Sequence, residues 1–580
     1  MNDVIVRLLT EIYGASQAEG LAEEIGTLVA KRRSHLIPPE NRGRGDLPLD
    51  ETDAFLITYG DSFRRDGTVP LQGLREFADR KLTGIISGIH ILPFFPYSSD
   101  DGFSVIDYEQ VNGDYGDWKD VAEIGASFKL MSDLVLNHCS AKSLWFRRFL
   151  EGDPLYRDFF VTASPDDDLS MVVRPRTHPL LTPFETSEGV RHVWTTFSAD
   201  QVDLNFANPA VMLEMIRILL FHVEKGIQVI RLDAIAYLWK EIGHPSIHHP
   251  KTHAAVKLFR AVLDVAAPWV VVLTETNVPH EENISYFGNG SDEAHMVYQF
   301  PLPPLVLDAF LEEDAGVLRK WASNLTGLSA KTTFFNFLAS HDGIGVMPAR
   351  GILPQNRIDR LVNTTLKRGG LISYKATPEG SIPYEMNITY LDAVAEKELP
   401  DSVRARKFLA SQSIMLALRG VPGIYYHSLV GSENWREGVE DTGRNRTINR
   451  EKLQLDPLLD AINEAGSLRN RIYSGFRAML QARRTTSAFD PAGRMEILPT
   501  EGAVFGLVRI SPDKKERVVC LVNLAPVAKE ATFPVIVLGG KPASDFIDLI
   551  EDSSVVPLIT GKDLTFQLEP YGVRWIKPRN

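Results

Sequence analysis

The chain has 580 residues, of which 44% are hydrophobic and 24% are charged, and these proportions are typical of a globular protein with a large core. Its 75 acidic residues outnumber its 62 basic ones, and the net charge of −13 argues against a nucleic-acid-binding face and against a cationic membrane surface. The two cysteines, Cys139 and Cys520, cannot form a disulfide framework or a Cys-x-x-Cys metal site. We see no signal-peptide pattern and no apolar run long enough to cross a membrane, so we expect a soluble cytoplasmic protein.

The first 48 residues differ in pattern from the rest of the chain. Apolar side chains recur at helical spacing over residues 4–33, which predicts two amphipathic helices. The polar stretch that follows contains Pro38, Pro39 and Pro48 and is typical of a linker. We therefore assign residues 1–48 to an N-terminal helical extension.

After this extension, short apolar runs alternate with helical patterns. Eight runs have the length and composition of buried strands. They cover residues 54–59, 88–93, 129–138, 226–235, 269–275, 296–300, 332–339 and 423–426. Helical patterns such as residues 209–226 and 253–267 lie between them. Eight strands with helical crossovers predict an α/β protein built on a (β/α)8 TIM barrel.

Two connections are too long to be simple crossovers, and both leave from the carboxyl ends of strands. Beyond about residue 480 the pattern changes to strands separated by turns, which predicts a C-terminal all-β domain. The expected parts are the barrel at 49–138, 209–342 and 404–485, inserted segments at 139–208 and 343–403, and the β domain at 486–580.

The fourth predicted strand carries a charged pair at its far end. Arg231 and Asp233 are two residues apart, so on a strand their side chains point to the same side. A neighbouring cation lowers the pKa of a carboxyl group and keeps it ionised. An ionised carboxylate at the carboxyl end of a barrel strand is placed as a nucleophile would be. A buried structural ion pair explains this stretch equally well when it is considered alone.

Two further carboxylates follow strand ends, Glu275 after the fifth strand and Asp342 after the seventh. In a barrel, these two acids and Asp233 converge on one mouth. Several carboxylates close together repel one another, so such a cluster indicates a functional site. Crowding also raises a carboxyl pKa and can leave one group protonated near neutral pH. An ionised carboxylate beside a protonated one is the pair that retaining glycosidases use.

Four stretches around these acids resemble the α-amylase-type glycoside hydrolase family. They are residues 133–138, 230–234, 273–276 and 339–342, and they occur in the order of the family's motifs. The resemblance implies that Asp233 is the nucleophile and Glu275 the general acid/base. It implies that Asp342 stabilises an oxocarbenium-like transition state and binds sugar hydroxyls. It also implies that Arg231 keeps the nucleophile ionised.

The resemblance extends to further sugar ligands. His138 and His341 would donate hydrogen bonds to the glucosyl ring, although a core position is the plainer explanation of a buried histidine.

The chain is also similar to the sucrose phosphorylase branch of the family, at residues 56–61, 89–96, 100–108, 341–345 and 446–450. This similarity implies that Asp100 closes around glucose, with Phe103 as an apolar platform and Arg446 as a sugar ligand. A core phenylalanine and a surface salt bridge are the alternatives for the last two.

Within that branch the chain most resembles the glucosylglycerate phosphorylases, and this similarity includes the N-terminal extension. It is carried by residues 174–176, 179–184, 194–197, 239–241, 275–280, 292–300 and 383–390. Residues 243–250, Gly-His-Pro-Ser-Ile-His-His-Pro, depart from the Thr-Ser-Cys-Ile-His-like stretch of such enzymes. We expect this loop to lie on the acceptor side, which leaves the identity of the acceptor open.

Phosphorolysis would require cations or N–H donors at the mouth of the barrel, because phosphate and glycerate are both anions. The residues expected to supply them are Arg174, Arg176, Tyr237, Lys240, Arg350 and Gln355. Without the resemblance, the Arg-Pro-Arg stretch at 174–176 would be interpreted as a solvated surface loop.

The resemblance thus implies a reversible α-retaining phosphorylase, which acts through a β-glucosyl-aspartate intermediate. Its expected substrates are small molecules: glucosylglycerate and phosphate in one direction, α-glucose 1-phosphate and glycerate in the other. We expect no cofactor, no metal, no nucleic acid and no membrane partner. The alternatives are a phosphorylase for sucrose or glucosylglycerol, a retaining α-glucosidase or transglucosidase, and a non-catalytic sugar-binding barrel. A monomer and a homodimer both remain open.

Overall fold

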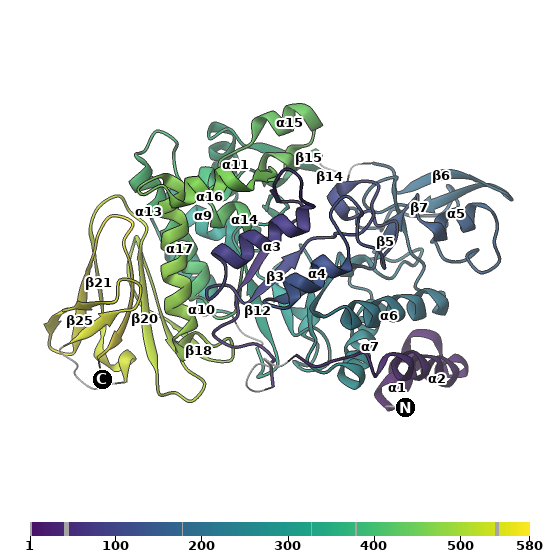
Figure 1. The fold of residues 1–580 in the computed structure, drawn as a ribbon, viewed down its shortest axis with the longest axis horizontal. Helices are drawn as coiled ribbons and strands as arrows, with labels where there is room; N and C mark the ends of the chain where they lie inside the picture. The colour runs from purple at the N-terminus through teal and green to yellow at the C-terminus, as the bar shows by residue number, and fades with distance from the viewer. Residues whose placement is uncertain are drawn as a thin grey trace.

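At the centre of the computed structural model, eight parallel strands form a closed barrel in the order β1-β16-β12-β11-β10-β9-β4-β3 (Figure 1). The structure describes residues 3–39, 46–176, 178–325, 328–377, 380–539 and 545–579. The barrel strands are β1 (Phe55–Thr58), β3 (Gly88–Ile91), β4 (Lys129–Val135), β9 (Ile227–Asp233), β10 (Val271–Thr274), β11 (Met296–Tyr298), β12 (Thr333–Asn336) and β16 (Val421–Tyr425). The predicted (β/α)8 barrel is therefore confirmed.

Helices cover the outside of this barrel. They are α3 (Pro70–Lys81), α4 (Trp118–Gly125), α6 (Pro209–Glu224), α7 (Pro250–Ala266), α8 (His280–Ile284), α9 (Leu302–Glu312), α10 (Gly316–Ser323), α13 (Asp401–Ala417) and α17 (Leu468–Arg484). Helices α6 and α7 begin in the same way, with a proline in the first turn and a polar side chain at the N-cap. Asn208 accepts from the amide of Ala210, and His249 accepts from the amide of Lys251. These caps satisfy orphan amides and fix where each helix starts.

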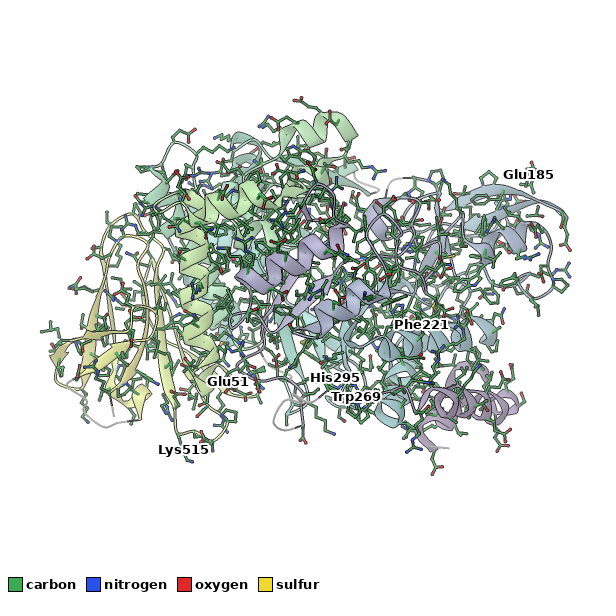
Figure 2. The ribbon with its side chains drawn as sticks, in the orientation of Figure 1. Glu51, Glu185, Phe221, Trp269, His295 and Lys515 are labelled. Carbon is green, nitrogen blue, oxygen red and sulfur yellow. The ribbon has the colours of Figure 1, made fainter. Side chains whose placement is uncertain are left out.

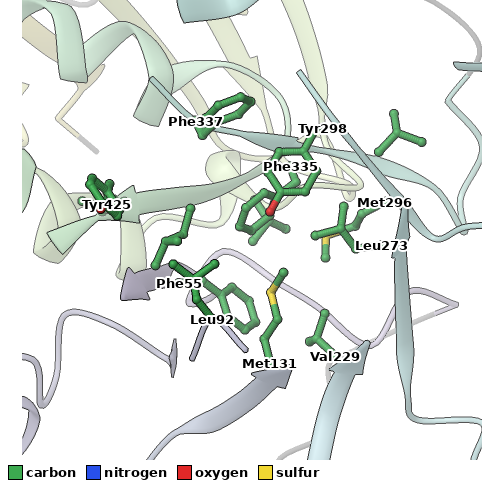
Figure 3. Packing of buried hydrophobic residues seen from close by; sticks show 14 of the residues in the cluster. Phe55, Leu92, Met131, Val229, Leu273, Met296, Tyr298, Phe335, Phe337 and Tyr425 are labelled. Carbon is green, nitrogen blue, oxygen red and sulfur yellow. The ribbon is translucent and has the colours of Figure 1, made fainter. Parts of the chain in front are cut away.

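The barrel interior is filled by large apolar side chains (Figure 3). The rings of Phe55 and Phe335 lie 6.2 Å apart. Glycines on the neighbouring strands make room for them, since a Cβ at Gly88 would lie 2.3 Å from the Phe55 ring and one at Gly423 would lie 2.4 Å from the Phe335 ring. Burial of a phenylalanine contributes up to about 3 kcal/mol, so a larger residue at either glycine would be destabilising.

The N-terminal extension forms two helices, α1 (Asp3–Tyr13) and α2 (Ala15–Arg32), as the spacing predicts. They pack against α7 and α6 respectively. The hydroxyl of Tyr13 donates to the carbonyl of Phe206 at 2.9 Å. Arg32 forms an ion pair with Glu224, and its guanidinium lies 5.6 Å from the ring centre of Phe221, which Figure 2 labels. The extension therefore supports two crossover helices of the barrel.

The chain leaves the barrel earlier than the sequence predicts after its third strand. The predicted strand at 129–138 is divided, because β4 ends at Val135 and His138 begins an antiparallel strand outside the barrel. A continuous apolar run carries no sign of such a bend. The insertion consists of β5 (His138–Ser140), α5 (Leu144–Leu150), β6 (Leu181–Thr186), β7 (Gly189–Trp194) and β8 (Gln201–Asp203). The β6–β7 hairpin projects outward, with Glu185 near its outer end (Figure 2).

Two further groups of elements stand over the carboxyl ends of the barrel strands. After β12 come β13 (Ile344–Gly345), α11 (Gln355–Lys367), β14 (Leu371–Thr377), β15 (Gly380–Asn387) and α12 (Tyr390–Val394). After β16 come α14 (Tyr426–Leu429), α15 (Arg436–Thr442), the 3-10 turn η5 (Asn445–Asn449), β17 (Leu453–Gln454) and α16 (Leu455–Asn463), and β17 pairs with β2 (Phe63–Arg64). Strands β14 and β15 lie in the upper part of Figure 1, whereas Trp269 and His295, which precede β10 and β11, lie in the lower part of Figure 2.

The last part of the chain is a pair of packed antiparallel sheets, which confirms the predicted all-β region. One sheet has the order β18-β19-β20-β26-β22-β23 and the other β21-β25-β24. The strands are β18 (Arg494–Ile497), β19 (Val504–Ile510), β20 (Arg517–Asn523), β21 (Lys529–Pro534), β22 (Phe546–Asp548), β23 (Ser553–Val555), β24 (Leu558–Thr560), β25 (Asp563–Leu568) and β26 (Val573–Pro578). Across the described ranges, no helix is both long enough and apolar enough to span a membrane.

Candidate active site

Strand ends of the barrel deliver the three predicted acids to one place. Asp233 is the last residue of β9, Glu275 directly follows the neighbouring strand β10, and Asp342 lies in the turn between β12 and β13. All three line a single hollow of about 70 Å³. The convergence expected from the strand pattern is therefore present in the structure.

Arg231 lies at the centre of these acids and is almost fully buried. Its Nη1 is 2.6 Å from Asp233 Oδ1 and also contacts Asp133, while its Nη2 is 3.9 Å from Glu275 Oε2. Burial opposes ionisation of Asp133, but Arg231 and His90, whose Nε2 is 2.6 Å away, lower the pKa of that carboxyl to about 2. Asp133 thus holds the guanidinium in place as a permanent counter-charge.

Asp233 and Glu275 are buried carboxyl groups at the ends of two adjacent strands. Burial raises the pKa of both groups, and Arg231 opposes this rise at both. Proximity to Glu275 raises the pKa of Asp233 further. The chain turns sharply after the strand because Ala234 has a left-handed backbone (φ 48°), and its amide donates to Glu275 Oε2 at 3.0 Å. Two adjacent strand ends therefore hold both carboxyls towards the same hollow.

Asp342 has a different electrostatic environment. Burial alone would raise its pKa, but Arg446, with a smaller contribution from Arg450, lowers it below the usual range of an aspartate. Arg446 Nη1 is 2.5 Å from Asp342 Oδ1, and the same guanidinium binds both oxygens of Glu385 at 2.5 and 3.1 Å. Asp342 is therefore held as an anion by arginine, whereas burial raises the pKa of Asp233 and that of Glu275.

Part of the wall of the hollow is formed by aromatic rings and uncharged histidines. The rings of Phe103 and His341 are stacked, with centres 4.8 Å apart. His138 Nε2 is 3.0 Å from the carbonyl of Phe103, and Gln201 Nε2 lies 3.1 Å from that nitrogen and 3.3 Å from Asp100 Oδ2. Burial lowers the pKa of His138, and it lowers that of His341 to about 3. Both imidazoles are therefore neutral at physiological pH.

A wider vestibule of about 470 Å³ adjoins the hollow. Six residues line both spaces and so form the neck between them: Asp100, Arg176, Phe197, Gln201, Glu385 and Arg446. The guanidinium of Arg176 lies 5.9 Å from the ring centre of Phe197 and 6.0 Å from that of Tyr384. It makes no ion pair with any described residue. An arginine held by aromatic faces keeps its N–H groups available for an anion.

Of the other residues predicted at the mouth, the structure brings none into the lining of either space. Tyr237 packs edge-on against Phe197, with ring centres 5.5 Å apart. Lys240 is buried, with its Nζ 2.5 Å from Asn137 Oδ1 and 3.0 Å from Asp203 Oδ2. The ammonium of Lys240 is therefore engaged by protein groups.

The arginines and the glutamine of the two long segments are also placed elsewhere. Gln355 is exposed on α11 and donates to Asp359 at 2.8 Å. Arg350 follows the 3-10 turn η4 (Met347–Ala349). Arg174 has its Nε and Nη2 buried without a hydrogen-bond partner among the described residues. Only Arg176 of this predicted set reaches the neck.

Several lining residues were not predicted, namely Phe197, Gln201, Asn277, Tyr384, Glu385 and, in the vestibule, Arg444 and Arg450. Asn277 has its Oδ1 buried without a hydrogen-bond partner in the described part of the chain. Most of these residues lie within stretches that resemble the family. Their place in those stretches is the feature of the sequence that could have identified them as lining residues. No group of three or more His, Cys, Asp or Glu side chains among the described residues could hold a metal ion.

Comparisons with known proteins agree with this geometry. Residues 66–346 match the model of the α-amylase catalytic domain. The chain is 56% identical to a glucosylglycerate phosphorylase of Spirochaeta thermophila, over 99% of this chain and 98% of the relative. It is 42% identical to a glucosylglycerate phosphorylase of Escherichia coli, over the full length of both.

More distant relatives share the fold. A sucrose phosphorylase of Streptococcus mutans is 26% identical over 82% of this chain and 97% of the relative. The crystal structure of a sucrose 6F-phosphate phosphorylase from Thermoanaerobacter thermosaccharolyticum superposes with a TM-score of 0.71 at 24% identity, covering 82% of this chain and 94% of that one. The chain belongs to the α-amylase family of glycoside hydrolases, together with the glucosylglycerate phosphorylases and their sucrose phosphorylase relatives.

Proposed function

We propose that the protein is a reversible, α-retaining phosphorylase that converts 2-O-α-D-glucosyl-D-glycerate and phosphate to α-D-glucose 1-phosphate and D-glycerate. The observation that carries the proposal is that one hollow holds two carboxyl groups from adjacent strand ends, Asp233 and Glu275, beside a carboxylate that arginine keeps ionised, Asp342. Two neighbouring carboxyl groups suit double displacement at a sugar carbon. The relatives named as glucosylglycerate phosphorylases support glycerate as the acceptor.

The position of Arg231 supports a particular location for the proton of the pair. Its nitrogen is 2.6 Å from Asp233 but 3.9 Å from Glu275. Because Coulombic attraction falls with distance, the ionised form is favoured more at Asp233. Glu275 then carries the proton, and it carries it on Oε1, since Oε2 accepts from the amide of Ala234. Asp233 is thus the nucleophile and Glu275 the general acid.

The reaction follows from these protonation states. Asp233 attacks the anomeric carbon while Glu275 gives its proton to the glycosidic oxygen, so the bond to glycerate breaks and the acceptor leaves with its hydroxyl restored. The product is a β-glucosyl ester of Asp233. An oxygen of hydrogen phosphate then attacks the same carbon and displaces Asp233, and its proton returns to Glu275. Two inversions leave the α configuration unchanged.

Other lining residues would hold the glucosyl ring. Asp342 would stabilise positive charge developing at the ring and bind hydroxyls, with Arg446 keeping it ionised. Asp100 and the two neutral histidines, His138 and His341, would make further hydrogen bonds. The face of Phe103 suits the apolar face of a sugar. The hollow thus offers hydrogen-bonding groups around one apolar wall.

The anionic co-substrate would bind at the neck. Arg176 lies there without a carboxylate partner among the described residues, and its planar fork matches phosphate and carboxylate oxygens. Asn277 also lines the hollow and offers a polar side chain there. Arg174, Tyr237, Lys240, Arg350 and Gln355 lie outside both spaces, so we assign them no direct contact with phosphate or glycerate.

We place this activity in the cytoplasm. Cys139 and Cys520 are both free and buried, as expected for a protein from a reducing compartment. Phosphate as a co-substrate is consistent with the same location.

The decisive experiment measures release of glycerate from glucosylglycerate with and without phosphate. The wild-type protein should form α-glucose 1-phosphate only when phosphate is present, and the variant Asp233→Asn should lose at least about 10³-fold in turnover while its melting temperature stays close to wild type. Phosphate-independent release of glucose would indicate a glucosidase instead. Phosphorolysis of sucrose or glucosylglycerol in preference to glucosylglycerate would overturn the choice of acceptor.

A further inference from the structure

Four of the charged residues that line the vestibule form ion pairs with one another. Asp101 forms an ion pair with Arg450, and Glu385 binds Arg446 through both carboxylate oxygens. Arg446 is also bound to Asp342. These cations are therefore already neutralised by the protein and are poorly suited to attract a free anion into the vestibule.

Two lining arginines are not engaged in this way: Arg176 at the neck, which lies beside two aromatic rings, and Arg444. Arg444 is exposed, and within the described ranges its side chain makes no ion pair and no hydrogen bond. Its backbone is nevertheless well anchored. The preceding Gly443 ends α15 in a left-handed conformation (φ 65°), and the following Asn445 donates to the carbonyl of Ile372 in β14 at 3.4 Å. The guanidinium is thus free to move on a fixed base at the rim of the vestibule.

The location of this free charge matters because the protein as a whole is acidic, with a net charge of −13. Small oxyanions approaching such a protein are repelled unless a local cation reverses the field near the site. Arg444 lines the vestibule close to another lining residue, Asp101. Burial raises the pKa of Asp101, Arg450 lowers it, and Arg444 makes a smaller contribution in the same direction as Arg450. The position of Arg444 is therefore outside the neck, on the route by which a co-substrate enters.

We propose that Arg444 is a specificity-determining residue that captures the anionic co-substrate, phosphate or glycerate, and passes it to Arg176 at the neck. This inference rests on the proposed phosphorylase activity. It assigns two successive cations to one route, a mobile arginine at the rim and an arginine held by the rings of Phe197 and Tyr384 deeper in. Because the outer contact is made in open solvent, its contribution should be sensitive to salt.

The test compares Arg444→Gln with a matched control, Arg406→Gln. Arg406 is an exposed arginine of α13 without an ion pair to any described residue, and it does not line the vestibule. The neutral donor α-glucosyl fluoride is used, and the KM of phosphate and the KM of glycerate as acceptors are measured separately. Hydrolysis of the same donor by water, without either anion, reports on the glucose site alone.

We expect Arg444→Gln to raise the KM of one or both anions about 5- to 10-fold at low ionic strength, with a smaller rise at about 0.5 M salt. Hydrolysis of the donor should be unchanged, and the control variant should behave as wild type. The phosphate and glycerate arms show which anion depends on the residue. Unchanged KM values for both anions, an equal change in the control, or an equal loss of hydrolysis would overturn the inference. Absence of phosphate-dependent activity in the wild type would instead refute the proposed function.

Discussion

The hollow and the vestibule are adjacent and use the same kinds of side chains, but different parts of the fold build them. The acids of the hollow sit at or just beyond strand ends of a closed barrel, and its central cation, Arg231, is buried between carboxyl groups. The vestibule is lined by residues of turns and insertions, and one of its cations, Arg444, is exposed and unpaired within the described chain. The comparison indicates that the barrel determines the chemistry at the glucosyl carbon, whereas the loops determine which molecule enters or leaves beside it.

The largest effect that can test this division is removal of the proton donor. We expect Glu275→Gln to lower turnover of glucosylglycerate about 10³-fold, because the leaving hydroxyl then receives no proton. Formation of the glucosyl-enzyme from α-glucosyl fluoride should fall much less, since fluoride leaves without protonation. The measurement is pre-steady-state fluoride release from each variant.

Asp233→Asn supplies the contrast for that measurement. It removes the attacking oxygen and should abolish fluoride release as completely as it abolishes turnover of the natural substrate. If Glu275→Gln and Asp233→Asn were equally inactive on the fluoride, the separate roles assigned to the two acids would be wrong.

A smaller effect is expected from the guanidinium that keeps Asp342 ionised. Arg446 lowers the pKa of that carboxyl against the effect of burial. In Arg446→Gln the pKa should therefore rise, and a protonated, inactive Asp342 should appear at a higher pH than in wild type. We expect kcat/KM to fall about 10²-fold and its acid limb to move upward in pH.

A companion variant separates this effect from a loss of folding. Arg446→Gln leaves both Asp342 and Glu385 without this cation, whereas Arg446→Gln combined with Glu385→Gln leaves only Asp342 without it. The double variant should recover thermal stability and keep the displaced acid limb. An acid limb at the wild-type position in both variants would contradict the role given to Arg446.

The difference between the two regions also explains what the sequence could predict. The convergence of Asp233, Glu275 and Asp342 was predictable because apolar runs of strand length mark where each barrel strand ends, and parallel strands bring those ends together. The position of Glu385 was not predictable, since Glu385 is far in sequence from Arg446. The two side chains come together because Glu385 lies on the β14–β15 hairpin and Arg446 lies in η5. Contacts between loops depend on tertiary structure that no local pattern records.

Lys240 shows the same limit within the loop that follows the nucleophile. Its position in the sequence suggested a cation at the mouth, but the left-handed turn at Ala234 and the 3-10 turn η2 (Ile235–Tyr237) direct the chain elsewhere. The side chain instead joins Asn137 to Asp203, at the base of the insertion that carries His138. The Lys240 ammonium, which the sequence suggested would line the vestibule, thus supports residues beside His138, which lines the hollow.

This placement leads to the smallest of the expected effects. Lys240→Met should raise the KM of every glucosyl donor about 10-fold, without any preference for anionic acceptors, because it loosens Asn137 and the adjacent His138. It should also lower stability, since Asp203 is fully buried and would lose its cation. Adding Asp203→Asn removes that unpaired charge, so the double variant should regain stability.

The KM of the double variant then decides between two roles. If Lys240 only neutralises Asp203, the donor KM should return to the wild-type value together with the melting temperature. If Lys240 positions the glucose-binding residues, the KM should stay high in a stably folded protein, because methionine cannot donate to Asn137 Oδ1. We expect the second result for both glucosylglycerate and α-glucosyl fluoride. A rise in KM confined to phosphate or glycerate would place Lys240 back on the acceptor side and would break the division between hollow and vestibule.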